Sequence, residues 1–180
     1  KRHQQGRPSR AQSRRQFPWR DRDRDRALLP WDRVPEEALA AERERLSVTL
    51  RAMAEGVITT DMQGKVLFLN EAAAQLTGWS EDVAVGRGLD EVCVLRHEKT
   101  GVPVPAPAVA AVSGHRVIEL PASTALLDRQ GVPRLVEGRC APIHDMRSQA
   151  IGAVLVLRDV TERARLEGEI LRASKLESVG

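Results

Sequence analysis

The chain has 180 residues, enough for one domain of about 100–150 residues with flanking segments. Its hydrophobic content of 42% supports a packed core, but an aromatic content of 3% means that this core consists mainly of Val, Leu, Ile and Ala. No apolar run approaches the roughly 18 residues of a membrane-spanning helix and no signal peptide is recognisable, so we expect a cytoplasmic protein. Because the chain starts at Lys1 rather than Met and ends abruptly at Gly180, we expect a fragment of a longer protein.

Residues 1–34 carry an uneven share of the charge. They hold eleven basic residues against four Asp, a net charge of +7, whereas the whole chain carries +3 and the remainder therefore −4. Alternating charges at 21–26 and nearby prolines predict a disordered tail, or a translation of sequence upstream of the true start. An Arg-rich tail is compatible with a nucleic-acid-associated protein, which stays an alternative. Because the Asp residues dilute the charge and no RNA-binding motif accompanies it, we expect no nucleic-acid partner.

Residues 35–54 are predicted to form a helix. Pro35 and the two Glu residues that follow suit a helix N-terminus, and Gly56 ends the helical pattern. Apolar residues at spacings of seven, four and three mark one face: Leu39, Leu46, Leu50 and Met53. This spacing leaves two interpretations open, a helix packed on its own domain or a short coiled coil with a second copy.

A hairpin and a small helix are predicted next. The strands Val57–Thr60 and Val66–Leu69 flank a four-residue turn that has Gly in its last position. Asn70 is placed to cap a helix over 71–77, which Gly78 ends. Glycines and prolines between 86 and 107 predict short helices and loops for the middle of the domain.

Three further strands are predicted over Val117–Leu127, Pro133–Ile143 and Ile151–Leu157. The second of these alternates apolar and charged residues, so it has one buried and one exposed face. The polar residues 144–149 form a loop after it. The third is apolar on both faces, so we expect the flanking helices to cover its outer side.

At residues 159–163 the pattern changes from strand to helix. Asp159 and Glu162 have the spacing of a capping box, with Asp in place of Ser or Thr. The helix that follows has a thin apolar stripe: Leu166, Ile170, Ala173 and Leu176. Such a helix buries little by itself, so we expect it to lie against the identical helix of a second copy.

The sequence contains no P-loop, G-x-S-x-G or H-E-x-x-H motif. Asp90 and Glu91 are adjacent, so their carboxylates point apart and do not form an acid/base pair. Cys93 and Cys140 have apolar neighbours and no C-x-x-C spacing, which is typical of buried free thiols rather than of a disulfide or a metal site. We predict neither a catalytic residue nor a metal ligand in this chain.

Together these pieces resemble a PAS domain over about residues 55–160. The segments that carry the resemblance are G-V-I-T-T-D-x-x-G-x-V-x-x-x-N at 56–70, the A-A-x-x-L-T-G-W segment ending at Trp79, the D-R-Q-G turn with the later Pro142-Ile143, and G-A-V-L-V-L-R-D-V-T-E-R-A-R-L-E at 152–167. The final S-K-L-E-S-V-G, 174–180, resembles the residues just before the phosphoacceptor helix of sensor histidine kinases.

This resemblance implies an α+β fold, in which short helices cover one face of a five-stranded antiparallel sheet. Helices at 35–54 and 161–180 would flank the sheet, and the second would lead as a coiled coil to an output domain. The implied function is sensing and relay for a sensor histidine kinase of a two-component phosphorelay. Its partners would be a second copy, bound through the flanking helices, the kinase output domain and a response regulator. The alternatives are a module that feeds a cyclic-dinucleotide enzyme or a transcriptional regulator.

The resemblance also implies site residues. Asp159, Thr161 and Arg163 would couple the sheet to the exit helix. Seven side chains are candidates to line a cavity between sheet and helices: Ile58, Leu67, Leu76, Val92, Val136, Cys140 and Val154.

A cofactor is not identified by the sequence, and we expect none. Flavin-binding members carry an Asn-Cys-Arg-Phe motif, which the surroundings of Cys93 do not match. For haem the candidate ligands are His97 and His115, and for a small carboxylate they are Arg87 and Arg96. A packed interior that serves dimerisation and relay is the favoured interpretation.

Overall fold

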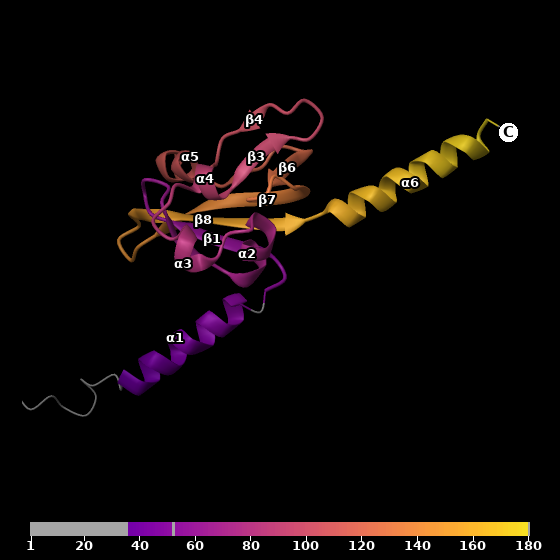
Figure 1. Cartoon of the computed structure of the whole chain (residues 1–180). Coiled ribbons are helices and arrows are strands. Elements are labelled where there is room, and N and C mark those ends of the chain that lie inside the picture. The colour runs from indigo at the N-terminus through magenta and orange to yellow at the C-terminus, as the bar shows by residue number, and fades with distance from the viewer. Residues whose placement is uncertain (1–35, 52, 180) are drawn as a thin grey trace, which may run out of the picture. The chain divides into compact units, whose positions relative to one another are not determined.

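Figure 1 shows the computed structural model of the chain, which describes residues 36–51 and 53–179. The predicted tail, 1–34, lies outside these residues. The chain divides into two units, of which the second begins at Arg43 and holds the whole sheet. Helix α1 (Glu36–Arg51) begins in the first unit, with two glutamates in its first turn. Leu39 and Leu46 of its predicted stripe are 50% and 56% exposed.

Within residues 53–179, eight strands form one antiparallel sheet. Its order is β2-β1-β8-β7-β6-β3-β4, and β5 pairs with β7 beside this path. The bounds are β1 (Gly56–Thr60), β2 (Val66–Leu69), β3 (Val94–His97), β4 (Pro103–Val104), β5 (Ile118–Glu119), β6 (Thr124–Leu127), β7 (Pro133–His144) and β8 (Ala150–Asp159). The first five strands of this order are the predicted ones, and the first hairpin lies beside the last strand of the chain.

Short helices pack against this sheet, and a longer one leaves it. They are α2 (Glu71–Thr77), α3 (Glu81–Ala84), α4 (Leu89–Val92), α5 (Ala108–Gly114) and the exit helix α6 (Thr161–Glu177). Figure 1 shows α2 to α5 gathered beside the strands, and β8 running directly into α6. Asn70 caps α2 by accepting from the N–H of Ala73, and Gly78 ends it with φ 73°, as predicted.

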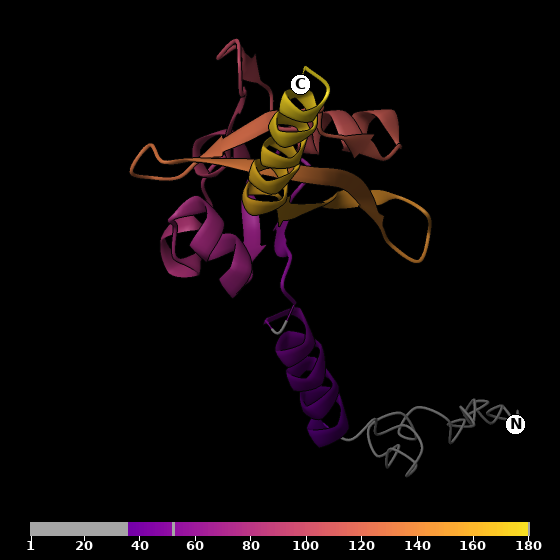
Figure 2. The same ribbon diagram turned by 90° about the vertical axis from the view of Figure 1, so that its right-hand side faces the viewer.

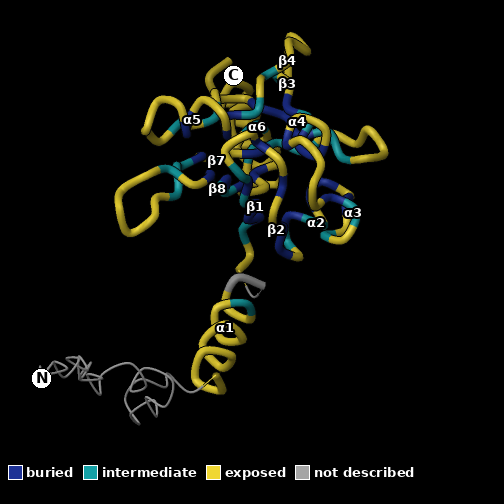
Figure 3. The backbone as a smooth tube through the Cα atoms, turned by 90° about the vertical axis from the view of Figure 1, so that its left-hand side faces the viewer, coloured by how far each residue is buried: buried dark blue, intermediate teal, exposed yellow. Residues whose placement is uncertain are grey.

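A single hydrophobic cluster joins the sheet to α2–α5. Its largest fully buried side chains on the sheet include Ile58, Leu126, Leu155 and Leu157. Burying an aliphatic side chain of this size contributes about 1.5–3 kcal/mol, so a few such residues determine where the helices dock. Figure 3 shows the burial concentrated in the strands and short helices, whereas α6 has no buried residue.

Two sequence expectations for the middle of the chain are wrong. The predicted strand 117–127 is broken into β5 and β6, because Pro121 offers no N–H to a ladder and Ser123 adopts a φ of 57°. The region 94–104, expected as helices and loops, forms the β3–β4 hairpin on the edge of β6. Pro103 argues against a strand at β4 when the sequence is considered alone. It is tolerated there because β4 is an edge strand.

The outer side of β8 is not covered by α6. Val154 and Val156 are half-buried and Ile151 is 51% exposed, while every residue of α6 stays unburied. The flanking helices were expected to cover this side, and α6 does not provide that cover within one chain.

Three tight turns share one pattern of hydrogen bonds. In each, an aspartate side chain accepts from the backbone N–H groups two and four residues later. The turns begin at Asp61, Asp128 and Asp145, and the residue three positions on has positive φ: Gly64 (79°), Gly131 (83°) and Ser148 (60°). The segment 144–149, predicted only as a polar loop, is thus a third copy of the same turn. Figure 2 shows the β6–β7 and β7–β8 turns at opposite ends of β7.

Candidate functional site

The junction between β8 and α6 is held by a local turn. The N–H and the hydroxyl of Thr161 both donate to Oδ1 of Asp159, at 2.9 and 2.6 Å. A carboxylate that accepts from a backbone N–H two residues later fixes the chain direction and satisfies one of the free donors at a helix start. The predicted capping box is wrong, because Val160 is the N-cap residue and Glu162 pairs with Arg165 instead.

Strand β7 holds the same junction from the side. The N–H of Leu135 donates to the hydroxyl oxygen of Thr161 at 3.0 Å, and the N–H of Val160 donates to the carbonyl of Leu135 at 2.9 Å. The Thr161 hydroxyl therefore accepts from β7 while it donates to β8. One side chain joins the two strands and the first residue of the exit helix.

Two ion pairs flank these hydrogen bonds. Arg134 lies 3.5 Å from Asp159, and Arg163 lies 2.5 Å from Glu137. All four side chains are more than a third exposed, so each pair contributes at most about 1 kcal/mol. We call this group the exit joint, and its members are Arg134, Leu135, Glu137, Asp159, Val160, Thr161 and Arg163.

The exit joint changes the acidity of its central carboxyl group. Partial burial opposes ionisation of Asp159, but the hydrogen bonds from Thr161 and the charge of Arg134 outweigh it. Together they hold the pKa of Asp159 below its ordinary value. The carboxylate is therefore ionised, and a full acceptor, across the physiological pH range.

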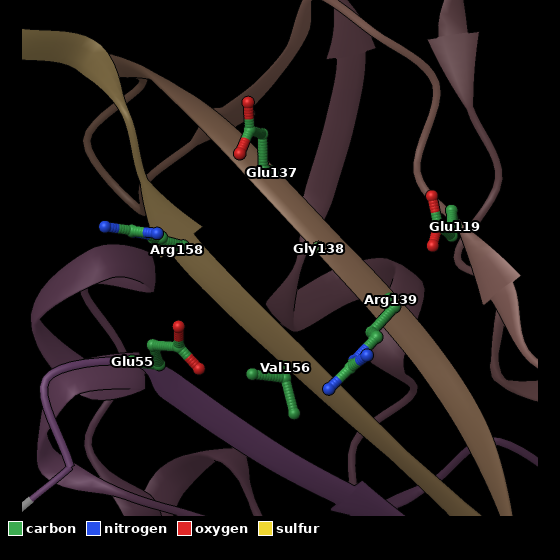
Figure 4. A pocket seen from close by; sticks show the side chains of 7 residues that line it. All are labelled: Glu55, Glu119, Glu137, Gly138, Arg139, Val156 and Arg158. Carbon is green, nitrogen blue, oxygen red and sulfur yellow. The ribbon is translucent and has the colours of Figure 1, made fainter. Parts of the chain in front are cut away.

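An open hollow of about 370 Å³ lies beside the exit joint, on the face of β7 and β8 opposite the core (Figure 4). Its lining residues are Glu55, Glu119, Glu137, Gly138, Arg139, Val156 and Arg158. Three carboxylates and two guanidinium groups give it charges of both signs. Among the described residues, no group of three or more His, Cys, Asp or Glu side chains is arranged to hold a metal ion.

Five of the seven candidate cavity residues face the core: Ile58, Leu76, Val92, Val136 and Cys140. The other two do not. Leu67 is 55% exposed, between the buried Val66 and the half-buried Phe68 on β2. Val154 lies on the outer face, because it alternates with Ala153 and Leu155, which belong to the core.

The two cysteines lie in the core as free thiols. Burial, with smaller contributions from Asp90 and Cys140, raises the pKa of Cys93 to about 12. Burial likewise raises the pKa of Cys140 to about 11. Both groups are protonated at neutral pH and are poor nucleophiles and metal ligands.

The four candidate ligand residues are not brought together. His97 is half-buried in β3 and accepts at Nδ1 from the N–H of Thr100, while Arg96 beside it is exposed. His115 is exposed at the end of α5, with its ring 6.0 Å from that of His144. Arg87 is an exposed residue between α3 and α4. None of the four side chains is fully buried, and the structure does not place them around one common point.

The three members of the exit joint that lie on β7 were missed in the sequence. Arg134, Leu135 and Glu137 lie about 26 residues before their partners, and their contacts depend on the register of β7 against β8. Asp159 and Thr161 form a local motif, which a sequence can reveal. The register is set by side-chain packing along the whole strand pair and has no comparable local signal.

No helix in the described part of the chain has the length and apolar character needed to cross a membrane. A family model described as PAS fold matches residues 50–165. The chain is 32% identical over 130 residues to the probable diguanylate cyclase DgcE of Escherichia coli (strain K12), covering 72% of this chain and 12% of that protein. It is also 32% identical over 143 residues to the alginate biosynthesis sensor protein KinB of Pseudomonas aeruginosa, covering 77% of this chain and 22% of that protein.

The chain therefore spans less than a quarter of the length of either relative. The crystal structure of a PAS domain from Colwellia psychrerythraea superposes with a TM-score of 0.52 at 21% identity, covering 69% of this chain and 98% of that one. That likeness concerns the fold alone. The match to the family model extends over the whole sheet and through the exit joint, and the chain belongs to the PAS fold family.

Proposed function

We propose that this PAS sensory domain is the relay module of a sensor histidine kinase, and that the exit joint passes its state to α6 and to an output domain. One observation carries the proposal: α6 is bonded to both β7 and β8 at its first residue, yet has no buried residue along its 17-residue length. A helix fixed only at its start follows any rearrangement of the strands that hold it. Such a device biases two positions of an output domain.

Two findings favour a kinase as the output. The relative KinB is a sensor protein, and residues 174–180 resemble the segment before a phosphoacceptor helix. One finding favours a second candidate, a cyclic-dinucleotide enzyme, because DgcE is a probable diguanylate cyclase with the same identity to this chain. Both outputs fit the same relay, because the exit joint acts on the direction of α6 and not on the chemistry beyond it.

The two outputs are separated by one assay on the full-length natural protein. It is incubated with labelled ATP and, separately, with GTP. A kinase incorporates phosphate from ATP into an acid-labile, base-stable phosphohistidine. A cyclase converts GTP into cyclic di-GMP and incorporates no label. Cyclic di-GMP formation without phosphohistidine would replace the kinase proposal by the second candidate.

Asp159→Ala tests the relay itself. It removes the oxygen that accepts both hydrogen bonds from Thr161, and the partner of Arg134, while leaving the core untouched. Couplings between sites are typically worth a factor of five or more, so the ratio of highest to lowest output across growth conditions should fall by about fivefold, toward one. The measurement is a reporter of the output pathway in cells, with a circular dichroism melt to verify folding.

Asp145→Ala is the matched control. Asp145 is also exposed and also accepts two hydrogen bonds through Oδ1, here from two backbone N–H groups, but it lies in the turn at the other end of β8. It should leave the range of output unchanged. A normal range in Asp159→Ala would exclude the coupling role of the exit joint.

A further inference from the structure

Trp79 makes an unusual set of contacts for a core residue. It follows the C-cap of α2, is only 8% exposed and belongs to the hydrophobic cluster. Two guanidinium groups lie over its ring, that of Arg87 at 5.0 Å and that of Arg129 at 4.6 Å from the centroid. We call these three residues the Trp79 cluster. A guanidinium over an indole contributes about 0.5–1 kcal/mol at exposed sites and more when desolvated.

The first arginine belongs to the segment of short helices. Arg87 lies between α3 and α4, donates from Nε to the carbonyl of Val83, and pairs with Glu91. Its carbonyl accepts from the N–H of Val66, at the start of β2. The position of Arg87 therefore depends on how α3 and α4 pack against the first hairpin, β1–β2.

The second arginine belongs to the other side of the fold. Arg129 lies in the β6–β7 turn, which the Asp128 side chain holds through two backbone N–H groups. The N–H of Arg129 donates to the carbonyl of Thr77 at 2.9 Å, at the end of α2. The turn also packs closely on Gly78, where an added Cβ would lie 3.2 Å from the Arg129 nitrogen. The β6–β7 turn is thus docked on α2 by backbone and side chain together.

The same hairpin reaches the exit joint within a few residues. Strand β7 starts at Pro133, and Arg134 and Leu135 contact the residues that begin α6. From Arg129 to Leu135 the chain covers about 20 Å at most, as extended strand. The antiparallel ladder to β6, which pairs Pro133, Arg134 and Leu135 with residues 125–127, limits bending along this path.

We infer that the Trp79 cluster positions the β6–β7 hairpin and thereby links the arrangement of α2–α4 to the exit joint. This inference deepens the proposed function and rests on it, because it names the residues that join the covering helices to the relay. Arg129 is a positioning residue in this account: it acts on the start of α6 through β7 and contacts no residue of the exit joint itself in any described interaction.

The test is residue-resolved amide hydrogen exchange of the 180-residue chain with the Arg129→Ala substitution. Loss of the contact with Trp79 should speed exchange of the Leu135 and Thr161 amides by about twofold to fivefold. The Gln149 amide, which donates to Asp145 in the turn at the other end of β7, should keep its wild-type exchange rate, because local opening of that turn does not break the contact of Arg129 with Trp79. Arg129→Lys keeps the charge but not the planar stacking, so it should restore part of the protection.

The matched control is Arg147→Ala, which removes an exposed arginine from the turn of the same type at the other end of β7. It should leave the Leu135 and Thr161 amides unchanged. In a Trp79→Phe background, Arg129→Ala should change the exchange rates of the Leu135 and Thr161 amides less than it does in the wild type. The reason is that Trp79 and Arg129 form one contact, which either substitution weakens.

If the exchange rates of the Leu135 and Thr161 amides are the same in Arg129→Ala as in the wild type, the inference is wrong. An equal increase at Gln149 would also overturn it, because the effect of the arginine would then not be confined to the path from the β6–β7 turn to α6. The assay needs no output domain. If the full-length protein forms no phosphohistidine but the exchange effects are observed, only the proposed kinase output is wrong. If the exchange effects are absent, only the role of the Trp79 cluster is wrong, and the proposal for the exit joint is unaffected.

Discussion

At the scale of single residues, Asn70 joins three segments of the chain. Its Oδ1 accepts from the N–H groups of Val57 and Ala73 at 2.8 and 2.9 Å, and its Nδ2 donates to the carbonyl of Glu55 at 3.0 Å. The residue is 1% exposed. The capping role was visible in the sequence, because Asn before a helical pattern is a local signal. The link to β1 was not, because it depends on the pairing of the first hairpin.

Asn70→Ala should lower the free energy of unfolding by about 2–3 kcal/mol, measured by urea denaturation. The substitution removes a helix cap, worth about 1 kcal/mol, and leaves the N–H of Val57 buried without an acceptor. Asn70→Ser keeps an oxygen that can cap the N–H of Ala73 and should lose less stability. An Ala variant as stable as the Ser variant would contradict this assignment.

The lowered pKa of Asp159 predicts a pH dependence. A group whose pKa is lower in the folded state adds stability above its unfolded pKa, about 4 for Asp, and this stability disappears as the pH falls through the folded value. Asp159→Ala should therefore lower the free energy of unfolding by about 1–2 kcal/mol at pH 7, and by progressively less as the pH falls below about 4. Urea denaturation of both proteins from pH 7 to pH 3 measures this, and a constant difference would contradict it.

At the scale of elements, the sequence predicted what short-range chemistry determines. The hairpin β1–β2, the helix α2 and the strand β7 follow from turn residues, capping residues and alternation that lie within a few positions of one another. The β3–β4 hairpin depends on which edge of the sheet is free, and the break between β5 and β6 depends on Pro121 and on the positive φ of Ser123. Local sequence patterns reveal neither the free edge nor that φ angle. The prolines in both segments also argue against a strand.

The three aspartate turns allow a matched pair of substitutions. Ser148 adopts a φ of 60°, which costs a side-chain-bearing residue about 1 kcal/mol relative to Gly. Ser148→Gly should raise the free energy of unfolding by about 0.5 kcal/mol, because the greater freedom of Gly in the unfolded chain offsets part of the gain. Chemical denaturation measures this change.

Gly131→Ala is the reverse substitution in the equivalent turn. An added Cβ at Gly131 meets nothing within 4 Å, so the backbone conformation alone determines the result. It should lower stability by about 1 kcal/mol. Shifts of the same sign in both variants would rule out positive φ as the cause.

At the scale of the whole molecule, α6 presents an apolar stripe to solvent. Leu166, Ile170 and Leu176 are 46%, 69% and 78% exposed, and within the chain they pack on nothing that buries them. A single helix of this composition is marginal in water, and a second copy laid along the stripe would stabilise both helices. This supports the proposed dimer.

Ile170→Glu should therefore shift the chain toward the monomer and raise the dimer dissociation constant by about tenfold or more, as the burial of one aliphatic side chain implies. Sedimentation equilibrium over a range of concentrations measures this. Leu171→Glu makes the same aliphatic-to-carboxylate change on the opposite side of the helix, where Leu171 is 62% exposed, and should have a much smaller effect. Equal effects would show that charge and not the stripe is responsible.

The attachment of α6 at its first turn has a mechanical consequence. A rod of 17 residues is about 25 Å long, so a tilt of roughly 10° at its base moves its far end by about 4 Å. A displacement of that size approaches one helical turn, whereas the strands at the base need to shift by only a fraction of it. The length of the helix therefore amplifies a small displacement of the strands into a larger displacement of the C-terminal end of α6. Shortening or lengthening the helix would change the amplitude and the direction of that displacement.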